Sequence, residues 1–79
     1  MLHVTKAKYV KDYIVWAAFN DGSQGNVDLA NFLEGQMFIP LQDISLFSKL
    51  KLDPELSTIV WPNGADLAPE FLRQHIVQV

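Results

Sequence analysis

The sequence predicts an α+β fold: a single small domain, mostly an antiparallel β-sheet, with two or three short helices including one at the C-terminus. Three observations predict it. Residues 13–19 are apolar throughout and rich in β-forming side chains, an Asn-Asp-Gly turn follows at residues 20–22, and Pro69 begins a stretch with helical spacing of apolar residues. We expect residues 1–79 to form one domain, because 79 residues lie near the small end of what folds alone.

The first two predicted strands form an antiparallel pair. In residues 2–10, Leu2 and Val4 share a face with Lys6 and Lys8, whereas Ala7 and Tyr9 lie on the other face, so the apolar face switches midway along the strand. This switch indicates either a β-bulge or a strand whose two ends have different surroundings. Residues 13–19 are apolar on both sides of the alternation, which is typical of a central strand covered on both faces. The connection between the two segments is short enough for a hairpin.

A second hairpin is predicted where the Asp-Gly dipeptide follows this strand, because Asp-Gly favours either a type I′ turn or a turn with a G1 bulge. The return strand, residues 23–29, is polar, as is typical of an edge or solvent-facing strand. Asp28 is placed to cap a short helical turn at residues 29–33, which Gly35 would end.

The second half of the chain predicts shorter elements separated by proline, glycine and asparagine. Pro69 suits the first position of the last helix, which we expect to pack on the sheet. In order, the elements are an extended connector (36–41), a helix (42 or 43 to 47), two strands (49–52 and 56–61), a brief strand or bridge beside Trp61 (65–67) and a helix (69–76).

Nearly half of the chain, 49%, is apolar, and the mean hydropathy is +0.10. A domain this small has little interior for so much apolar surface, so part of that surface is predicted to face a partner. The alternative is a thorough core with a few scattered exposed apolar residues. Cysteine is absent, so core packing or self-association has to supply the stability that disulfides would give.

The net charge of −3 disfavours direct nucleic-acid binding, which relies on clustered Lys and Arg. The sequence has no secretory leader and no apolar run of about 18 residues, so we expect a cytoplasmic protein without membrane contact. A weaker alternative is nucleic-acid contact through a mild cluster of lysines: Lys6, Lys8, Lys11, Lys49 and Lys51.

The chain carries no catalytic signature and no phosphate-binding glycine loop, so neither an enzyme nor a cofactor is predicted. The histidines, His3 and His75, stand at opposite ends without ligand spacing, so no metal site is predicted. Asp21, Asp28 and Asp66 could converge in space as a carboxylate cluster. Each also has a local explanation, namely a turn, a helix cap and the amides of its own turn.

The order of these features resembles a known family. A strand ends in Phe-Asn-Asp-Gly at residues 19–22, a polar strand reaches Leu29, and a later strand runs into Trp-Pro-Asn-Gly-Ala-Asp-Leu at residues 61–67. Over nearly the whole chain this order is similar to the small bacterial family catalogued as domain of unknown function 2442. The resemblance implies a compact α+β domain with no particular activity. It also implies a setting in small two-gene modules that resemble toxin–antitoxin pairs.

Two functional hypotheses follow. The first is a non-enzymatic interaction module that binds a partner protein or itself, for example as a homodimer. The alternative is a small-molecule-binding or enzymatic domain with its site at Trp61, Asn63 and Asp66, where an aromatic ring, an amide and a carboxylate lie in one turn. Trp16 and Trp61 could each be a ligand platform or an interface anchor, although in a small core tryptophans are more often packing residues.

Overall fold

The computed structural model describes residues 1–77 and confirms the α+β fold class. Its strands form a three-stranded antiparallel sheet in the order β1–β2–β3 and a two-stranded sheet of β4 and β5, so the predicted sheet is divided in two. The elements are β1 (Val4–Lys11), β2 (Ile14–Phe19), β3 (Gln24–Asp28), the 3-10 helices η1 (Ala30–Phe32) and η2 (Ile39–Gln42), α1 (Ile44–Phe47), β4 (Lys51–Asp53), β5 (Thr58–Val60) and α2 (Pro69–Gln74).

Of the two alternatives predicted for the first strand, the bulge is confirmed. The pairing of β1 with β2 shifts between Val4 and Lys6, so Thr5 is an extra residue in β1. An extra residue reverses the alternation of side chains beyond it. Val4 is therefore buried, at 3% exposure, although it has the same parity in the sequence as the exposed Lys6.

The three-stranded sheet has two unlike faces, which the strand register defines. The inner face carries apolar side chains that belong to the core or pack against it, and these are Val4, Ala7, Tyr9, Val15, Ala17, Phe19 and Val27. The outer face carries the side chains at the alternate positions, and these are Lys6, Lys8, Lys11, Ile14, Trp16, Ala18, Gln24, Asn26 and Asp28.

The central strand β2 is covered on one face only. Val15 and Ala17 on its inner side are fully buried. Ile14, Trp16 and Ala18 on its outer side are partly exposed, and they are not among the side chains packed against the core. The prediction that this strand is covered on both faces is therefore wrong for a single chain, even though the apolar pattern is that of a doubly covered strand.

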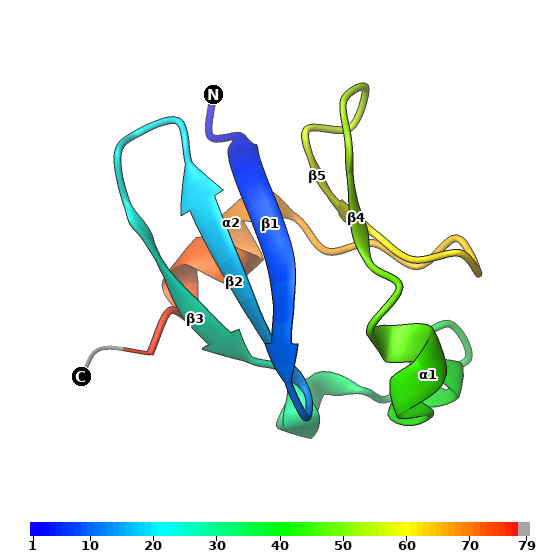
Figure 1. The fold of residues 1–79 in the computed structure, drawn as a ribbon. Helices are drawn as coiled ribbons and strands as arrows, with labels where there is room; N and C mark the ends of the chain where they lie inside the picture. Colours follow the sequence, from blue (N-terminus) through cyan, green and yellow to red (C-terminus); the bar gives the residue numbers. More distant parts are fainter. Residues whose placement is uncertain (78–79) are drawn as a thin grey trace.

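The inner face is covered by α2 and bordered by the smaller sheet. Figure 1 shows α2 behind the three strands, with β4 and β5 beside the β1 edge. Pro69 begins α2 as predicted, and Leu72 on this helix is fully buried. Among residues 1–77, no helix is long and apolar enough to cross a membrane. The largest fully buried side chains are Phe47, Leu29, Leu41, Ile59, Leu72, Val15 and Val27.

The turn between β2 and β3 has a G1 bulge, which is one of the two predicted alternatives. The N–H of Gly22 donates to the carbonyl of Phe19 at 3.1 Å, and within the turn Gly22 alone has a positive φ, of +90°. A type I′ turn would require positive φ at two central residues. Asp21 supports the turn by accepting hydrogen bonds from both the N–H and the hydroxyl of Ser23.

Aspartate side chains support the starts of two short helices. Asp43, one of the two residues predicted to begin this helix, caps α1, because its carboxylate accepts from the N–H of Ser45 at 3.0 Å. Asp28 accepts from the N–H of Ala30 at 3.0 Å, although the cap position of η1 is one residue later.

The connector at residues 36–41 was expected to be extended, and that prediction is wrong. Residues 36–38 form a turn, in which the N–H of Phe38 donates to the carbonyl of Gly35 at 3.1 Å. The helix η2 then begins at Ile39 and contains Pro40 in its first turn. A proline is compatible with a helix start, since its missing N–H would have no partner there in any case.

After α2 the chain returns to the free edge of β3. Ile76 forms an antiparallel bridge with Val27, and the N–H of Val77 donates to the carbonyl of Asn26 at 2.7 Å. A Cβ atom at Gly25 would lie 2.5 Å from Cγ2 of Ile76. Glycine at this position thus permits the close packing of the C-terminal segment on the sheet.

Candidate interaction surface

The outer face is arranged in three parallel rows of different chemistry. Lysines form the row on β1, apolar side chains form the row on β2, and amides with a carboxylate form the row on β3. The register places one residue of each row side by side at three levels: Lys6, Ala18 and Gln24; Lys8, Trp16 and Asn26; Lys11, Ile14 and Asp28.

Trp16 occupies the centre of the outer face. Its side chain is partly exposed, and Nζ of Lys8 lies 5.4 Å from the centroid of its ring. That distance is within the range of a cation–π contact, and the aliphatic stem of a lysine can pack along an aromatic ring. The contact restrains the indole against the sheet and leaves part of it accessible.

A hollow of about 470 Å³ lies beside Trp16, between β2, β3 and the C-terminal segment. Ile14 and Asp28 line it together with Val77, which is 49% exposed. At the same end of the sheet, the second register shift in β1 falls at Val10, whose side chain is 40% exposed. The hollow is large enough to receive apolar side chains of another molecule.

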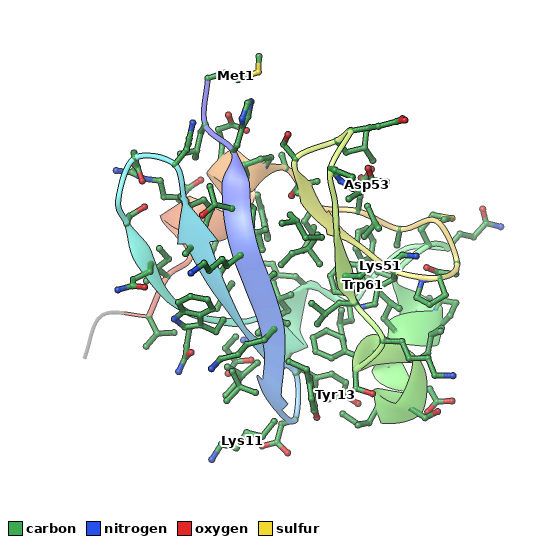
Figure 2. All side chains as sticks on the ribbon, turned by 45° about the horizontal axis from the view of Figure 1, so that its top comes forward. Met1, Lys11, Tyr13, Lys51, Asp53 and Trp61 are labelled. Atoms are coloured by element: carbon green, nitrogen blue, oxygen red, sulfur yellow. The ribbon has the colours of Figure 1, made fainter. Side chains whose placement is uncertain are left out.

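Within residues 1–77, no helix, strand or loop lies over the outer face, apart from Val77 at its β3 border (Figure 1). Figure 2 shows Tyr13 on the side of the first hairpin that faces α1, and Lys11 on the other side. Tyr13 is anchored there, because its hydroxyl donates to the carbonyl of Gln42. The first hairpin thus separates a packed side from an open one.

Burial divides the residues of the predicted ligand site. Trp61 is 2% exposed, and its Nε1–H donates to the carbonyl of Phe47 at 2.8 Å, so its indole is part of the core. Figure 2 shows Trp61 on the side of the molecule where β4 and α1 lie. Asn63 is partly exposed and Asp66 is exposed. A ligand at this turn would reach these two side chains and not the indole, and binding there stays a prediction.

Asn63 fixes the turn after Trp61, a role that the sequence assigned to Asp66. Oδ1 of Asn63 accepts from the N–H of Ala65 at 3.1 Å, and its Nδ2 donates to the carbonyl of Met37 at 2.9 Å. Asp66 pairs with β5 through its backbone, and no hydrogen bond of its carboxylate occurs within the described residues. The prediction for Asp66 is wrong because the extended backbone leaves its side chain exposed.

The three aspartates that could have converged have separate surroundings. Asp21 forms an ion pair with Arg73, with 2.6 Å between Oδ2 and Nε. Hydrogen bonds from the hydroxyl and the N–H of Ser23, assisted by Arg73, hold the pKa of Asp21 below its usual value. Asp28 lines the hollow on the outer face, and Asp66 lies beside β5. In the described part of the chain, no three His, Asp or Glu side chains are grouped as metal ligands.

His75 packs at the end of α2. Its ring lies 4.3 Å from that of Phe71 and 4.7 Å from that of Phe32, measured between centroids. Its Nδ1 lies 2.8 Å from the carbonyl of Phe71. The other histidine, His3, precedes β1, where its backbone N–H donates to the side chain of Asn20.

The lysines noted in the sequence lie on different elements. Three of them, Lys6, Lys8 and Lys11, lie on β1, whereas Lys51 begins β4. Figure 2 shows Lys11 and Lys51 well apart. The lysine row of β1 therefore belongs to the outer face, where it borders an apolar row and not a second basic strand.

Trp16 was predicted from the sequence as a possible anchor, whereas the outer face as a whole was not predicted. The lysine row could be seen in the sequence as alternation on β1. Its position beside Trp16 depends on the register of β1 on β2, and that register includes two shifts that the sequence does not locate in full.

A family model described as a protein of unknown function (DUF2442) matches residues 4–78, nearly the whole chain. The match agrees with the resemblance inferred from the order of turns and strands. No curated protein and no solved structure matches the chain.

Proposed function

Since the chain belongs to the DUF2442 family, whose function is unknown, its role has to be argued from its own surface, and we propose that it is a non-enzymatic protein-interaction module. Its binding surface is the outer face of the three-stranded sheet, and the occupant is another protein chain. The proposed setting is the one that the family resemblance implies, a small regulatory or toxin–antitoxin-like pair in the bacterial cytoplasm.

The observation that carries the proposal is the partly exposed apolar row of Ile14, Trp16 and Ala18 on a central strand. Tryptophan is enriched among the residues that dominate binding energy at protein interfaces. The flanking rows of lysines and amides resemble the polar rim that surrounds the apolar centre of such interfaces. A partner that covers this row would bury the second face of β2, and the sequence pattern of β2 is typical of a strand buried on both faces.

The shape of the surface favours a protein over a small molecule. The apolar row runs from Ile14 to Ala18, which is about 13 Å along an extended strand. It is open along its whole length, and the hollow beside Trp16 occupies only one end of it. A small ligand would fill the hollow and leave Ala18 uncovered, whereas a protein surface can cover the row and the hollow together.

Site-specific photo-crosslinking in the producing cells tests the proposal. A photoreactive amino acid replaces Gln24, an exposed residue of the outer face, and in a control chain it replaces Glu55, an exposed residue between β4 and β5. We expect the probe at position 24 to form a discrete adduct, identified by mass spectrometry. The Glu55 probe should not form that adduct, and Trp16→Glu should abolish it.

The result separates the alternatives clearly. A position-24 adduct with one defined protein that is lost in Trp16→Glu supports the proposal. If probes at positions 24 and 55 give the same diffuse adducts, or if Trp16→Glu leaves the adduct intact, the outer face is not the binding surface.

A further inference from the structure

We propose that the occupant of the outer face is a second copy of this chain, packed face to face about a two-fold axis that runs parallel to β2. The inference rests on the proposed function and names its partner. It follows from the order of the three rows, which makes the outer face complementary to itself.

The two-fold axis fixes which strands meet. A rotation about an axis parallel to β2 places β2 of one chain over β2 of the other, and β1 of each chain over β3 of its partner. Two sheets that pack in this way form a sandwich with a spacing of about 10 Å and strands within about 30° of each other. Trp16 then lies at the centre of the interface, next to the axis.

The polar side chains are complementary in this arrangement, and Lys11 with Asp28 is a pair of opposite charges. At each of the three levels, a lysine of one chain faces a side chain of the partner that can accept a hydrogen bond: Lys6 faces Gln24, Lys8 faces Asn26 and Lys11 faces Asp28. A two-fold axis across the strands would place the lysine row against itself. Like charges brought together in this way oppose association, so the axis parallel to β2 is the favoured one.

The apolar features match as well. Val10, exposed at the register shift beside Lys11, lies at the Asp28 end of the sheet. In the proposed dimer this end of β1 faces the partner's hollow, which Ile14 and Val77 line. Each chain would thus place its exposed Val10 in the partner's hollow.

The size of the surface sets the expected affinity. Three strands spaced about 4.8 Å apart, with a central strand of six residues, give a face of about 15 Å by about 20 Å. Two such faces bury less than the roughly 1,200 Å² of small specific interfaces. We therefore expect a reversible dimer with a dissociation constant on the order of micromolar.

Analytical ultracentrifugation of the full chain provides the first test. Between about 5 and about 500 µM, the average mass should rise from that of one chain toward twice that value. Trp16→Glu should weaken the association at least about tenfold, while Leu56→Glu, a matched change at a residue exposed outside the outer face, should not. Trp61 is then the remaining tryptophan of the Trp16→Glu chain, and its fluorescence on unfolding checks that this variant is folded.

Charge changes test the axis itself. Gln24→Lys should weaken self-association by roughly three- to tenfold, because it brings two lysines together at each of two symmetric positions. Lys6→Glu chains should bind Gln24→Lys chains more tightly than either variant binds itself. Neither side chain makes a hydrogen bond or ion pair among the described residues, so these changes leave the fold of each chain intact.

Three outcomes would overturn the inference. The wild-type chain could stay monomeric over the whole concentration range, Trp16→Glu could associate as strongly as wild type, or Lys6→Glu could associate more tightly with itself than with Gln24→Lys. The last result would indicate an axis that pairs β1 with β1. A monomeric chain that forms the position-24 adduct with a different protein would overturn this inference and leave the proposed function standing.

Discussion

The indole N–H of Trp61 donates to the backbone carbonyl of Phe47 at 2.8 Å, and the two rings lie 5.7 Å apart between centroids. Both residues are buried, Phe47 at the end of α1 and Trp61 directly after β5. The hydrogen bond therefore joins the middle segment of the chain to the smaller sheet inside the core. The bond and the ring contact assign Trp61 to the core, whereas Trp16 lies partly exposed on the outer face.

Removing this bond should cost stability. Trp61→Phe leaves the buried carbonyl of Phe47 without its donor and removes ring volume, which should lower the free energy of unfolding by about 2–4 kcal/mol. Urea unfolding followed by circular dichroism measures the change. The matched variant Trp16→Phe, at a partly exposed position, should change it by less than about 1 kcal/mol in dilute solution. Equal costs for the two variants would contradict the assignment of Trp61 to the core.

The turn after Trp61 should depend on Asn63 and not on Asp66. Asn63→Ala loses one accepted and one donated hydrogen bond, so it should lower the free energy of unfolding by about 1–2 kcal/mol. Asp66→Ala changes an exposed carboxylate and should stay within about 0.5 kcal/mol of wild type. Thermal melts of both variants decide the matter, and a larger loss for Asp66→Ala would restore the role that the sequence suggested.

Gly25 should be required for the return of the chain to β3. Gly25→Ala places a methyl group 2.5 Å from Cγ2 of Ile76, so the segment after α2 has to move away. We expect faster amide hydrogen exchange at Val77, whose N–H bonds to β3, and a lower melting temperature.

A second substitution separates this clash from other effects of alanine at position 25. Ile76→Ala removes the atoms that collide with the new methyl group. Ile76→Ala should therefore lower the melting temperature less in the Gly25→Ala chain than in the wild-type chain. Additive losses in the double variant would show that Gly25 acts for another reason.

Acid should destabilise the fold through two aspartates, Asp21 in the turn before β3 and Asp43 at the start of α1. Hydrogen bonds from the hydroxyl and the N–H of Ser45 lower the pKa of Asp43 from its ordinary value of 3.8, and those of Ser23 do the same for Asp21. A carboxyl group whose pKa is lower in the folded state stabilises the protein above its unfolded pKa, and this contribution is lost as the pH falls through the folded pKa.

The melting temperature should therefore fall as the pH is lowered below about 4. Ser45→Ala removes the main cause of the lowered pKa of Asp43, so it should reduce the size of this fall, and Ser23→Ala should do the same for Asp21. Melts at a series of pH values test this. If both variants lose stability with acid as steeply as wild type, other groups dominate the pH dependence.

Much of the fold could be predicted from local signals. Asp-Gly after an apolar strand predicted a turn, and Pro69 and the residues at positions 42 and 43 predicted helix starts; the structure has a turn or helix start at each place. The bulge near Val4 was also predictable, because an apolar side chain stood out of phase with the lysines that follow. The start of η2 was missed, since proline permits both an extended chain and a first helical turn.

The candidate surface was harder to predict, for a physical reason. An apolar residue on a strand indicates burial but not what buries it, so Trp16 and Val15 look alike in the sequence. Only the arrangement of α2 behind the sheet distinguishes the face of Val15, covered by the chain itself, from the face of Trp16 (Figure 1). Likewise, the carboxylate of Asp66 was expected to accept from the amides of its turn, and the side chain of Asn63 accepts there instead.

The most direct test of the outer face as a binding surface follows two indole N–H signals by NMR as the protein concentration is raised. Trp16 lies at the proposed interface, whereas the indole N–H of Trp61 is bonded inside the core. Between about 5 and about 500 µM, the Trp16 signal should shift progressively as the dimer forms, and the Trp61 signal should stay in place. A Trp16 signal that stays fixed over this range, or a shift confined to Trp61, would contradict the account.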